Sequence, residues 1–462
     1  MWENERRRGR FELERGLLAR VPRSFFNQSE ILPSLGTDRP SAFKEGYVST
    51  LERLHNQTVR PGGQWARAKT FGSQLWPDVQ REPWDVDHET PETNDLAMNY
   101  WNPSGAELLE FFRTGDPKWV WDFALPQSWL QMFTAYLNIG DHQIGNRGGL
   151  AVNSGGIGEG HWHRERRLAD GTSVNGSDDY NYNMGQHLAY AIRPNLPMRD
   201  RFCQAGRTLV DRYGIPRSRE MEREEFVSQI DITRQSIQHF EMLANAAEFV
   251  PTDELGAASF DGRLREIVRE LAEDNLSAGV MCQINEREPA VGDWCFLPQQ
   301  FMQNSQIYYF FLRYALNYDD NEGVRRMLVE APRVLNEYGL PHAADGSLVV
   351  EGDWASRLRV RLSADRTQVV GVELAPDSDN QLAMYGENKP QTMSLLWISD
   401  TLSGERDLSR LAADAADTMD FDASWGSVMM NESGWWKAAA QVMQGTVFGV
   451  GLYDEFRSVV GD

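Results

Sequence analysis

The chain has 462 residues, of which 41% are hydrophobic and 25% are charged, a composition typical of a globular protein. Its formal net charge of −22 argues against nucleic acid and against an anionic membrane as partners, because those associations depend on fields of Lys and Arg side chains. The aromatic share of 11% suits either a large core or a groove for a flat ligand such as a sugar ring.

Few features of the sequence bear on cellular location. The N-terminal stretch MWENERRRGRFELERGLL carries charged residues where a signal peptide would carry an apolar run, and no later window offers about eighteen uninterrupted apolar residues. We expect an extracellular or periplasmic protein if the chain is a segment of a secreted protein, and a cytoplasmic one otherwise. Cys203, Cys282 and Cys295 form no CxxC pair, so we expect buried thiols and neither a zinc knuckle nor a disulfide framework.

Helical hairpins are the main predicted elements. Residues 1–90 are expected to form an irregular, aromatic-rich lead-in that packs on the remaining domain, residues 91–462. Within residues 105–129, apolar residues at helical spacing lie on both sides of a TGDP break, which is typical of two helices joined by a tight turn. The same design returns at residues 185–213 and 307–338, each an aromatic helix, a short polar turn and an amphipathic helix.

The first two hairpins form a weak internal repeat. In register, Phe112, Arg113 and Pro117 fall on Ile192, Arg193 and Pro197. Further helical pairs are predicted from residues 231–250 with 262–275, and from residues 395–418 with 434–459. Such hairpins must bury their apolar faces against one another, as an open solenoid or as a ring, and the irregular spacing between them favours the ring.

One segment departs from the helical pattern. Residues 347–375 alternate polar and apolar side chains around SADRTQ, which predicts two or three antiparallel strands. We interpret this segment, at about 346–376, as a β insertion in a mainly α domain, because a helical pattern resumes after it and about thirty residues rarely sustain a separate core.

The connection between the first two hairpins is unusually rich in chemically useful side chains. Residues 145–182 form a glycine-rich stretch, GNRGGLAVNSGGIGEGHWHRERRLADGTSVNGSDDYNY. Its titratable and aromatic residues include Glu159, His161, His163, Arg164, Asp178, Asp179, Tyr180 and Tyr182. Long connections of this kind in a compact domain are usually functional, so we expect the site there.

Two short motifs carry a family resemblance. The hairpin turn FRTGDPKW at residues 112–119 and the GEGHWH stretch at residues 158–163 resemble the (α/α) toroid domains of carbohydrate-active enzymes. The nearest of these are polysaccharide lyases of the exo-rhamnogalacturonan lyase type and related glycuronyl hydrolases. The resemblance covers about residues 90–340. It implies an (α/α) toroid, a complete or incomplete ring of helical hairpins, with a polysaccharide or oligosaccharide substrate bound by loops at one mouth of the ring.

The resemblance implies a choice between two reactions. A lyase needs a cation or amide to neutralise the uronate carboxylate, a base and an acid, and the segment supplies these in His161, Arg164 and Tyr182. A hydrolase needs two carboxyl groups, which Glu159 with Asp178 or Asp179 would provide. We expect β-elimination with catalytic His161, Tyr182, Arg164, Glu159 and Asp179, and hydrolysis is the alternative. A glycan-binding or scaffolding module without catalysis is a third reading.

Other residues are expected to bind substrate. These are His163, Tyr180, Asn183, Asn94, Tyr100 and Trp435. Several of the candidate residues have a structural alternative: Asn94 and the Asp178–Asp179 pair would suit helix capping, and Tyr180 and Tyr182 would suit the core of the next helix. His161 and His163 face one side of an extended segment, as two metal ligands would, but no third ligand is identifiable, so no metal or other cofactor is predicted.

Overall fold

The structure, a computed structural model, describes the helical body of the chain and several short pieces outside it. The described residues are 48–49, 52, 55–56, 74–75, 96–97, 103–130, 165–167, 173–175, 184–213, 234–251, 258–275, 278–281, 294–296, 301–318, 321–351, 354, 358–365, 367–374 and 389–418. Most of them are helical, which confirms the mainly α fold class.

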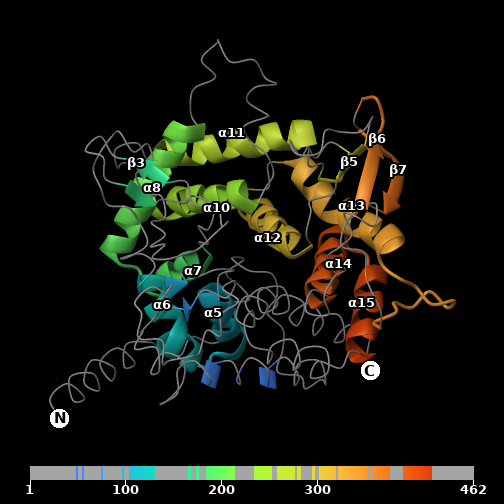
Figure 1. Cartoon of the computed structure of the whole chain (residues 1–462), viewed down its shortest axis with the longest axis horizontal. Coiled ribbons are helices and arrows are strands. Elements are labelled where there is room, and N and C mark those ends of the chain that lie inside the picture. The colour runs from blue at the N-terminus through green and yellow to red at the C-terminus, as the bar shows by residue number, and fades with distance from the viewer. Residues whose placement is uncertain are drawn as a thin grey trace.

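Helical hairpins follow one another along the described residues (Figure 1). They are α5 (Pro103–Thr114) with the π-helix η2 (Trp119–Ala124) and α6 (Leu125–Leu130), α7 (Met184–Ile192) with α8 (Leu196–Tyr213), α10 (Arg234–Phe249) with α11 (Ala258–Asn275), α12 (Phe301–Tyr318) with α13 (Glu322–Gly339), and α14 (Lys389–Ser403) with α15 (Asp407–Thr418). The first four correspond to the predicted helical pairs, which are thereby confirmed.

The last hairpin differs from the prediction. Residues 395–418 were expected to pair as one unit with residues 434–459, but they divide into α14 and α15, and residues 434–459 lie outside the described residues. The break falls at Gly404, whose φ of 76° favours glycine. Across this turn Asp400 Oδ2 accepts a hydrogen bond of 2.6 Å from Ser409 N, so the start of α15 is held to the end of α14.

Asx side chains start the second helix of three hairpins. Asp116 Oδ1 accepts from Lys118 N at 3.0 Å, Asn195 Oδ1 from Met198 N at 2.9 Å, and Asn321 Oδ1 from Val324 N at 3.1 Å. Each side chain satisfies a backbone N–H that has no partner within its helix, which is the physical reason why Asp and Asn are favoured before helices. The turn chemistry read from TGDP is therefore a recurring device of this fold.

The hairpins pack in two layers. The first helix of each hairpin belongs to one layer, the first layer, in which α5 contacts α7, α10 contacts α12 and α12 contacts α14. The rings of His187 and Phe249, whose centroids lie 5.1 Å apart, join α7 to α10. Among the second helices, α8 contacts α11 and α11 contacts α13. Figure 1 shows the helices following an arc from α5 over α10 and α11 to α14 and α15.

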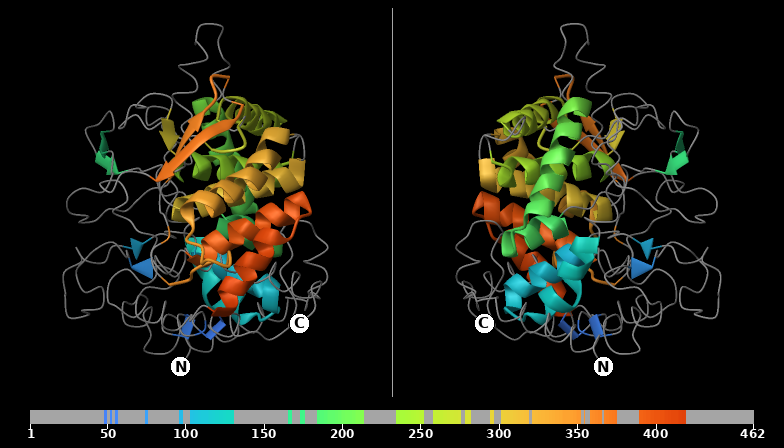
Figure 2. Two further views of the ribbon diagram at one scale, coloured as in Figure 1. Left: turned by 90° about the vertical axis from the view of Figure 1, so that its right-hand side faces the viewer. Right: turned by 90° about the vertical axis from the view of Figure 1, so that its left-hand side faces the viewer.

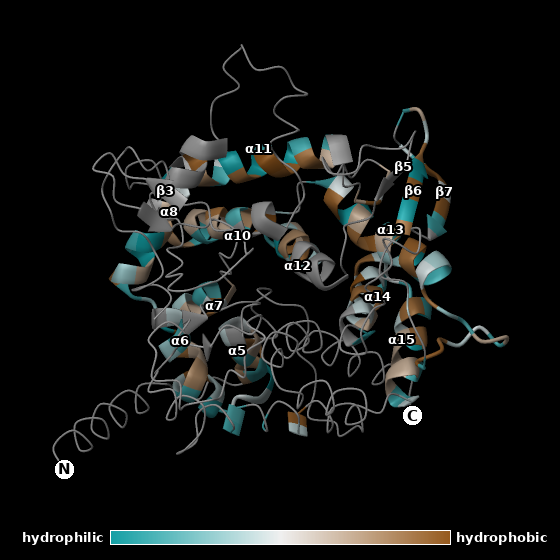
Figure 3. Ribbon diagram, in the orientation of Figure 1, coloured by the Kyte–Doolittle hydropathy of each residue, from teal (hydrophilic) through white to brown (hydrophobic). Residues whose placement is uncertain are grey.

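A continuous apolar core lies between the helices. Its largest fully buried side chains are Trp119, Phe123, Phe202, Phe240, Phe260, Trp354 and Trp397. Figure 3 shows hydrophobic and hydrophilic residues alternating along α11, as expected of a helix that packs on one side. At Gly206 of α8 the packing is so close that a Cβ atom would lie 2.7 Å from Ala246 Cβ of α10, so this glycine sets the approach of α8 to α10.

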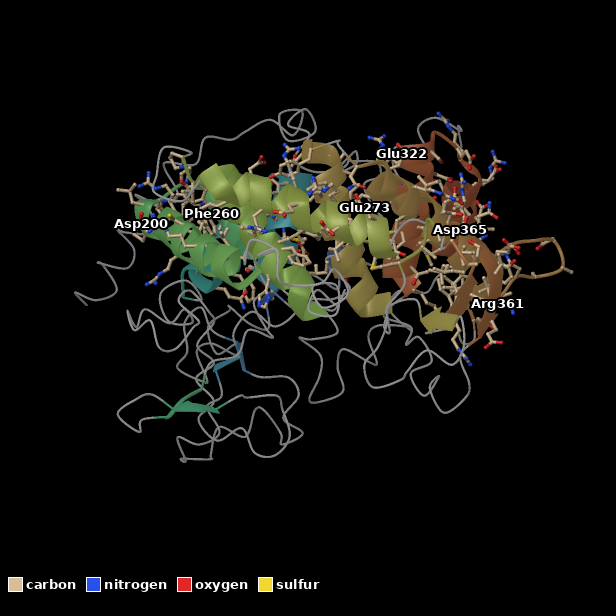
Figure 4. All side chains as sticks on the ribbon, turned by 90° about the horizontal axis from the view of Figure 1, so that it is seen from above. Asp200, Phe260, Glu273, Glu322, Arg361 and Asp365 are labelled. Carbon is tan, nitrogen blue, oxygen red and sulfur yellow. The ribbon has the colours of Figure 1, made fainter. Side chains whose placement is uncertain are left out.

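The predicted β insertion forms a hairpin at one end of the molecule (Figure 2). Strands β6 (Leu358–Leu362) and β7 (Val369–Leu374) are antiparallel, and β5 (Trp294–Phe296) adds a third strand in the order β5-β6-β7. Arg361 and Asp365 project from this hairpin, which contacts α13 (Figure 4). Two short antiparallel pairs also occur, β1 (Gln74–Leu75) with β2 (Leu96–Ala97) and β3 (Glu165–Arg167) with β4 (Ser173–Asn175).

Candidate functional site

The residues that the sequence selects lie outside the described residues. They are Asn94, Tyr100, Glu159, His161, His163, Arg164, Asp178, Asp179, Tyr180, Tyr182, Asn183 and Trp435. The described elements on either side of the segment are β3, which begins one residue after Arg164, and α7, which begins one residue after Asn183. The convergence of these residues on one site therefore stays a prediction.

Buried polar side chains of the described residues gather on the first helices of the hairpins. They are Ser104, Glu107, Glu110 and Arg113 on α5, Gln186 and His187 on α7, His239, Glu241 and Asn245 on α10, and Lys389, Thr392, Ser394, Ser399 and Asp400 on α14, whereas the described second helices carry Gln127 and Ser128 on α6 and Ser409 on α15. On α5 they follow the spacing i, i+3, i+6, i+9, which lies along one face of a helix. Burying such groups costs free energy, so their concentration in one layer makes that layer the candidate for chemistry.

The most extended network in this layer joins three first helices around Glu248. His187 Nε2 of α7 lies 3.1 Å from Glu248 Oε2 of α10. From α12, the Arg313 guanidinium donates to both carboxylate oxygens, with Nε at 3.1 Å and Nη2 at 2.7 Å, and Asn317 Nδ2 donates at 3.2 Å. The His187 side chain is 7% exposed and that of Glu248 is 20% exposed, so the network runs from the interior towards solvent.

The charges of this network fix the protonation of its histidine. Burial opposes ionisation of Glu248, but Arg313 and His187 outweigh it and hold the pKa of the carboxyl well below its usual range. Burial, together with the Arg313 charge, lowers the pKa of His187, so the ring is neutral near neutral pH. Because an ionised carboxylate only accepts, Nε2 of His187 carries the hydrogen, and Nδ1 keeps a lone pair that can accept a proton.

Two tyrosines of α12, the buried Tyr314 and the partly buried Tyr318, lie on the helix that carries Arg313 and Asn317. The rings of Tyr314 and Tyr318 stack at 4.7 Å with an interplanar angle of 18°, and the Arg265 guanidinium of α11 lies 4.6 Å from the Tyr318 ring. Burial raises the pKa of Tyr318, so its hydroxyl stays protonated. The network thus combines the neutral imidazole of His187, the ion-paired guanidinium of Arg313 and the amide of Asn317, with the phenol of Tyr318 on the same helix as Arg313.

Sequence reasoning missed this network. His187, Glu248 and Arg313 come from three hairpins and are separated by 61 and 65 residues along the chain. A signal was present in α10, where Glu241, Asn245 and Glu248 follow the spacing i, i+4, i+7 of one helix face. Among the described residues, no group of three or more His, Cys, Asp or Glu residues could hold a metal ion.

Comparisons with protein families, with characterised proteins and with solved structures found no match. In the described part of the chain, no helix combines the length and the apolar character needed to cross a membrane.

Proposed function

We propose that this protein is a carbohydrate-active enzyme that cleaves an acidic polysaccharide by β-elimination, on an (α/α) toroid formed by its hairpins. The observation that carries the proposal is the gathering of buried polar side chains on the first helices, one of which, His187, is bound through Glu248 to Arg313. A row of hairpins with no chemical task would bury apolar side chains there, because buried polar groups are tolerated mainly when they are paired or used.

The order of the hairpins supports a site at one edge of the first helices. Turns within hairpins are short, such as residues 193–195 and 319–321, whereas the connections at residues 131–183, 214–233 and 276–300 are long. In successive antiparallel hairpins, each long connection leads from the end of a second helix to the start of the next first helix. The starts of α7, α10 and α12 therefore lie at the same edge of the first layer, and we expect the segment with His161 and Tyr182 to reach that edge at the start of α7.

The local charge suits an acidic substrate. Although the chain has a net charge of −22, residues 163–167 read HRERR, with Arg164, Arg166 and Arg167 in four positions. Guanidinium groups bind carboxylates through paired hydrogen bonds, and neutralising the uronate carboxylate makes the neighbouring carbon acid easier to deprotonate.

The proposed reaction balances within this set of residues. A base, which we assign to His161, takes the proton next to the carboxylate. The released electron pair forms a carbon–carbon double bond, the bond to the glycosidic oxygen breaks, and Tyr182 gives that oxygen a proton. Arg164 holds the carboxylate, and general acid and base catalysis of this kind contributes about 10² to 10⁴ in rate. Glu159 and Asp179 would orient His161 and the leaving sugar.

The test is incubation with a panel of uronate polysaccharides, followed by two readouts. β-Elimination raises the ultraviolet absorbance of an unsaturated uronide, whereas hydrolysis by Glu159 with Asp178 or Asp179 gives new reducing ends without that absorbance. Binding without any product would replace the proposal with a glycan-binding module. His161→Ala and Tyr182→Phe should each abolish turnover and His342→Ala, at an exposed histidine, should not. Activity retained in both site variants would refute the site assignment.

A further inference from the structure

A short helical segment before the first hairpin docks on it through one face. Val48, Glu52 and His55 are helical and follow the spacing i, i+4, i+7, which places them on the same side. Val48 packs against the core, His55 is 3% exposed, and Ser49 and Asn56 are exposed on the other side. We call Val48, Glu52 and His55 the docking face (dark blue, below α5 in Figure 1).

The contacts of the docking face are mainly between charged groups. His55 Nδ1 lies 3.2 Å from Glu107 Oε2 of α5, whose side chain is 1% exposed, and His55 Nε2 lies 3.8 Å from Asp122 Oδ2 of η2. Glu52 accepts from Lys118 Nζ at 2.7 Å, and the His55 ring meets Trp119 edge-on at 4.9 Å. An imidazole between two carboxylates binds them as a cation and much less well as a neutral ring.

The docking face holds an uncommon stretch of helix. Both Trp119 and Asp122 belong to η2, a π-helix, which is a rare conformation that usually occurs as a single turn held by surrounding contacts. Two of those contacts come from His55 and one from Glu52 through Lys118. Release of the docking face would therefore also destabilise the π-helical conformation of η2.

We propose that the docking face, Val48, Glu52 and His55, forms a latch on the first hairpin that is closed while His55 is protonated and released when His55 loses its proton. The groups that face His55 are Glu107 from α5 and Asp122 from η2, with the Lys118 ammonium nearby on the same turn. Deprotonation removes the nearest cation from Glu107, a carboxyl whose pKa burial already raises, and a buried carboxylate that loses its paired cation is strongly unfavourable. This latch is independent of the proposed reaction and holds whatever the protein acts on.

The direction of the pH response follows from the folded and released states. Burial lowers the pKa of His55, but Glu107 and Asp122 outweigh it and raise the pKa from 6.5 to about 9. A group whose pKa is higher in the closed state favours closure when it is protonated. This effect is complete below the pKa of the released state, 6.5, and is lost as pH rises through the pKa of the closed state, about 9. The closed-to-open ratio should thus fall by about 300-fold in all from well below pH 6.5 to well above pH 9, and by about 80-fold between those two pH values.

Amide hydrogen exchange of the whole protein, corrected for the intrinsic effect of pH, tests the latch. Peptides covering residues 48–56 and η2 should lose protection between about pH 7 and about pH 10, while α13 serves as the internal reference and keeps it. His55→Gln should exchange rapidly in residues 48–56 already at about pH 7. His342→Gln is the matched control, because within the described residues the ring of the exposed His342 contacts the backbone carbonyls of Asn336 and Gly346.

Two results would overturn the latch. One is protection of residues 48–56 that does not change with pH in the unmodified protein. The other is a His55→Gln profile that matches the unmodified one. If His55→Gln does not fold, the pH profile of the unmodified protein decides the question, together with the pKa of His55 read by NMR of labelled histidine. Glu52→Gln, which removes the outer ion pair, should weaken protection and keep the same midpoint.

Discussion

Two clusters of charged side chains each contain a buried histidine. The first is His55 with Glu107 and Asp122 and the outer pair of Lys118 and Glu52, and the second is His187 with Glu248, Arg313 and Asn317. The pKa values of the two histidines are shifted in opposite directions. His55 and His187 are both buried beside glutamates, yet the pKa of His55 is raised to about 9 and that of His187 is lowered. The difference is the cation next to the carboxylate. Arg313 donates two hydrogen bonds to Glu248, whereas His55 lies between two carboxylates, Glu107 and Asp122. Burial lowers the pKa of both histidines, and the Arg313 charge adds to that effect at His187 while the two carboxylates outweigh it at His55.

Removing Arg313 should turn the second cluster into a copy of the first. In Arg313→Met, Glu248 keeps only His187 as a strong partner, so the pKa of His187 should rise, because burial is then opposed by an unshared carboxylate. The protein should lose about 4 kcal/mol of stability, because a largely buried carboxylate loses its paired cation. Urea unfolding measures the loss and NMR titration the pKa. Arg313→Lys keeps the charge and should lose less, and a His187 that titrates unchanged in Arg313→Met would contradict this account.

The clusters should respond to opposite ends of the pH range. For His55, stability is fully present below pH 6.5 and is lost as pH rises through about 9. For Glu248 and His187 the folded pKa values are lowered, so their contribution is present above the unfolded values of 4.5 and 6.5 and declines as pH falls below them. The alkaline loss should reach about 3 kcal/mol. Urea unfolding across the pH range measures it, and His55→Gln should abolish the alkaline decline while leaving the acid decline in place.

Packing under the second cluster offers a separate test. Gly206→Ala would force α8 away from α10, the helix that carries Glu248, because the new Cβ would lie 2.7 Å from Ala246 Cβ. The expected loss is about 2 kcal/mol, with a changed NMR titration of His187 and an unchanged one of His55. Gly262→Ala is the matched control in α11, where a Cβ meets nothing within 4 Å, and it should stabilise the protein by about 0.5 to 1 kcal/mol. A Gly206→Ala protein as stable as the original would show that α8 can shift at little cost.

The features that the sequence predicted depend on neighbouring residues, whereas those that it missed join residues far apart along the chain. Helical spacing and the TGDP turn predicted the hairpins, because 3.6-residue periodicity and Asx capping are local properties. The third strand β5 was missed because it reaches β6 from more than sixty residues away, and both histidine clusters were missed for the same reason. Residues such as His161 and Tyr182 lie outside the described residues and stay predictions. Chemistry that depends on distant pairing needs the three-dimensional arrangement.

The smallest expected effect is that of removing the exposed ion pair of the first cluster, Lys118 with Glu52, while the buried pair of His55 and Glu107 stays in place. Lys118 is 30% exposed and pairs with Glu52, which is 47% exposed. Solvent screens such a pair, so Lys118→Met should cost about 0.5 kcal/mol in urea unfolding. The methionine also retains apolar contact with Trp119, above which the Lys118 ammonium lies at 4.6 Å. A loss as large as that of His55→Gln would mean that the outer pair, rather than the buried imidazolium, holds residues 48–56 on the first hairpin.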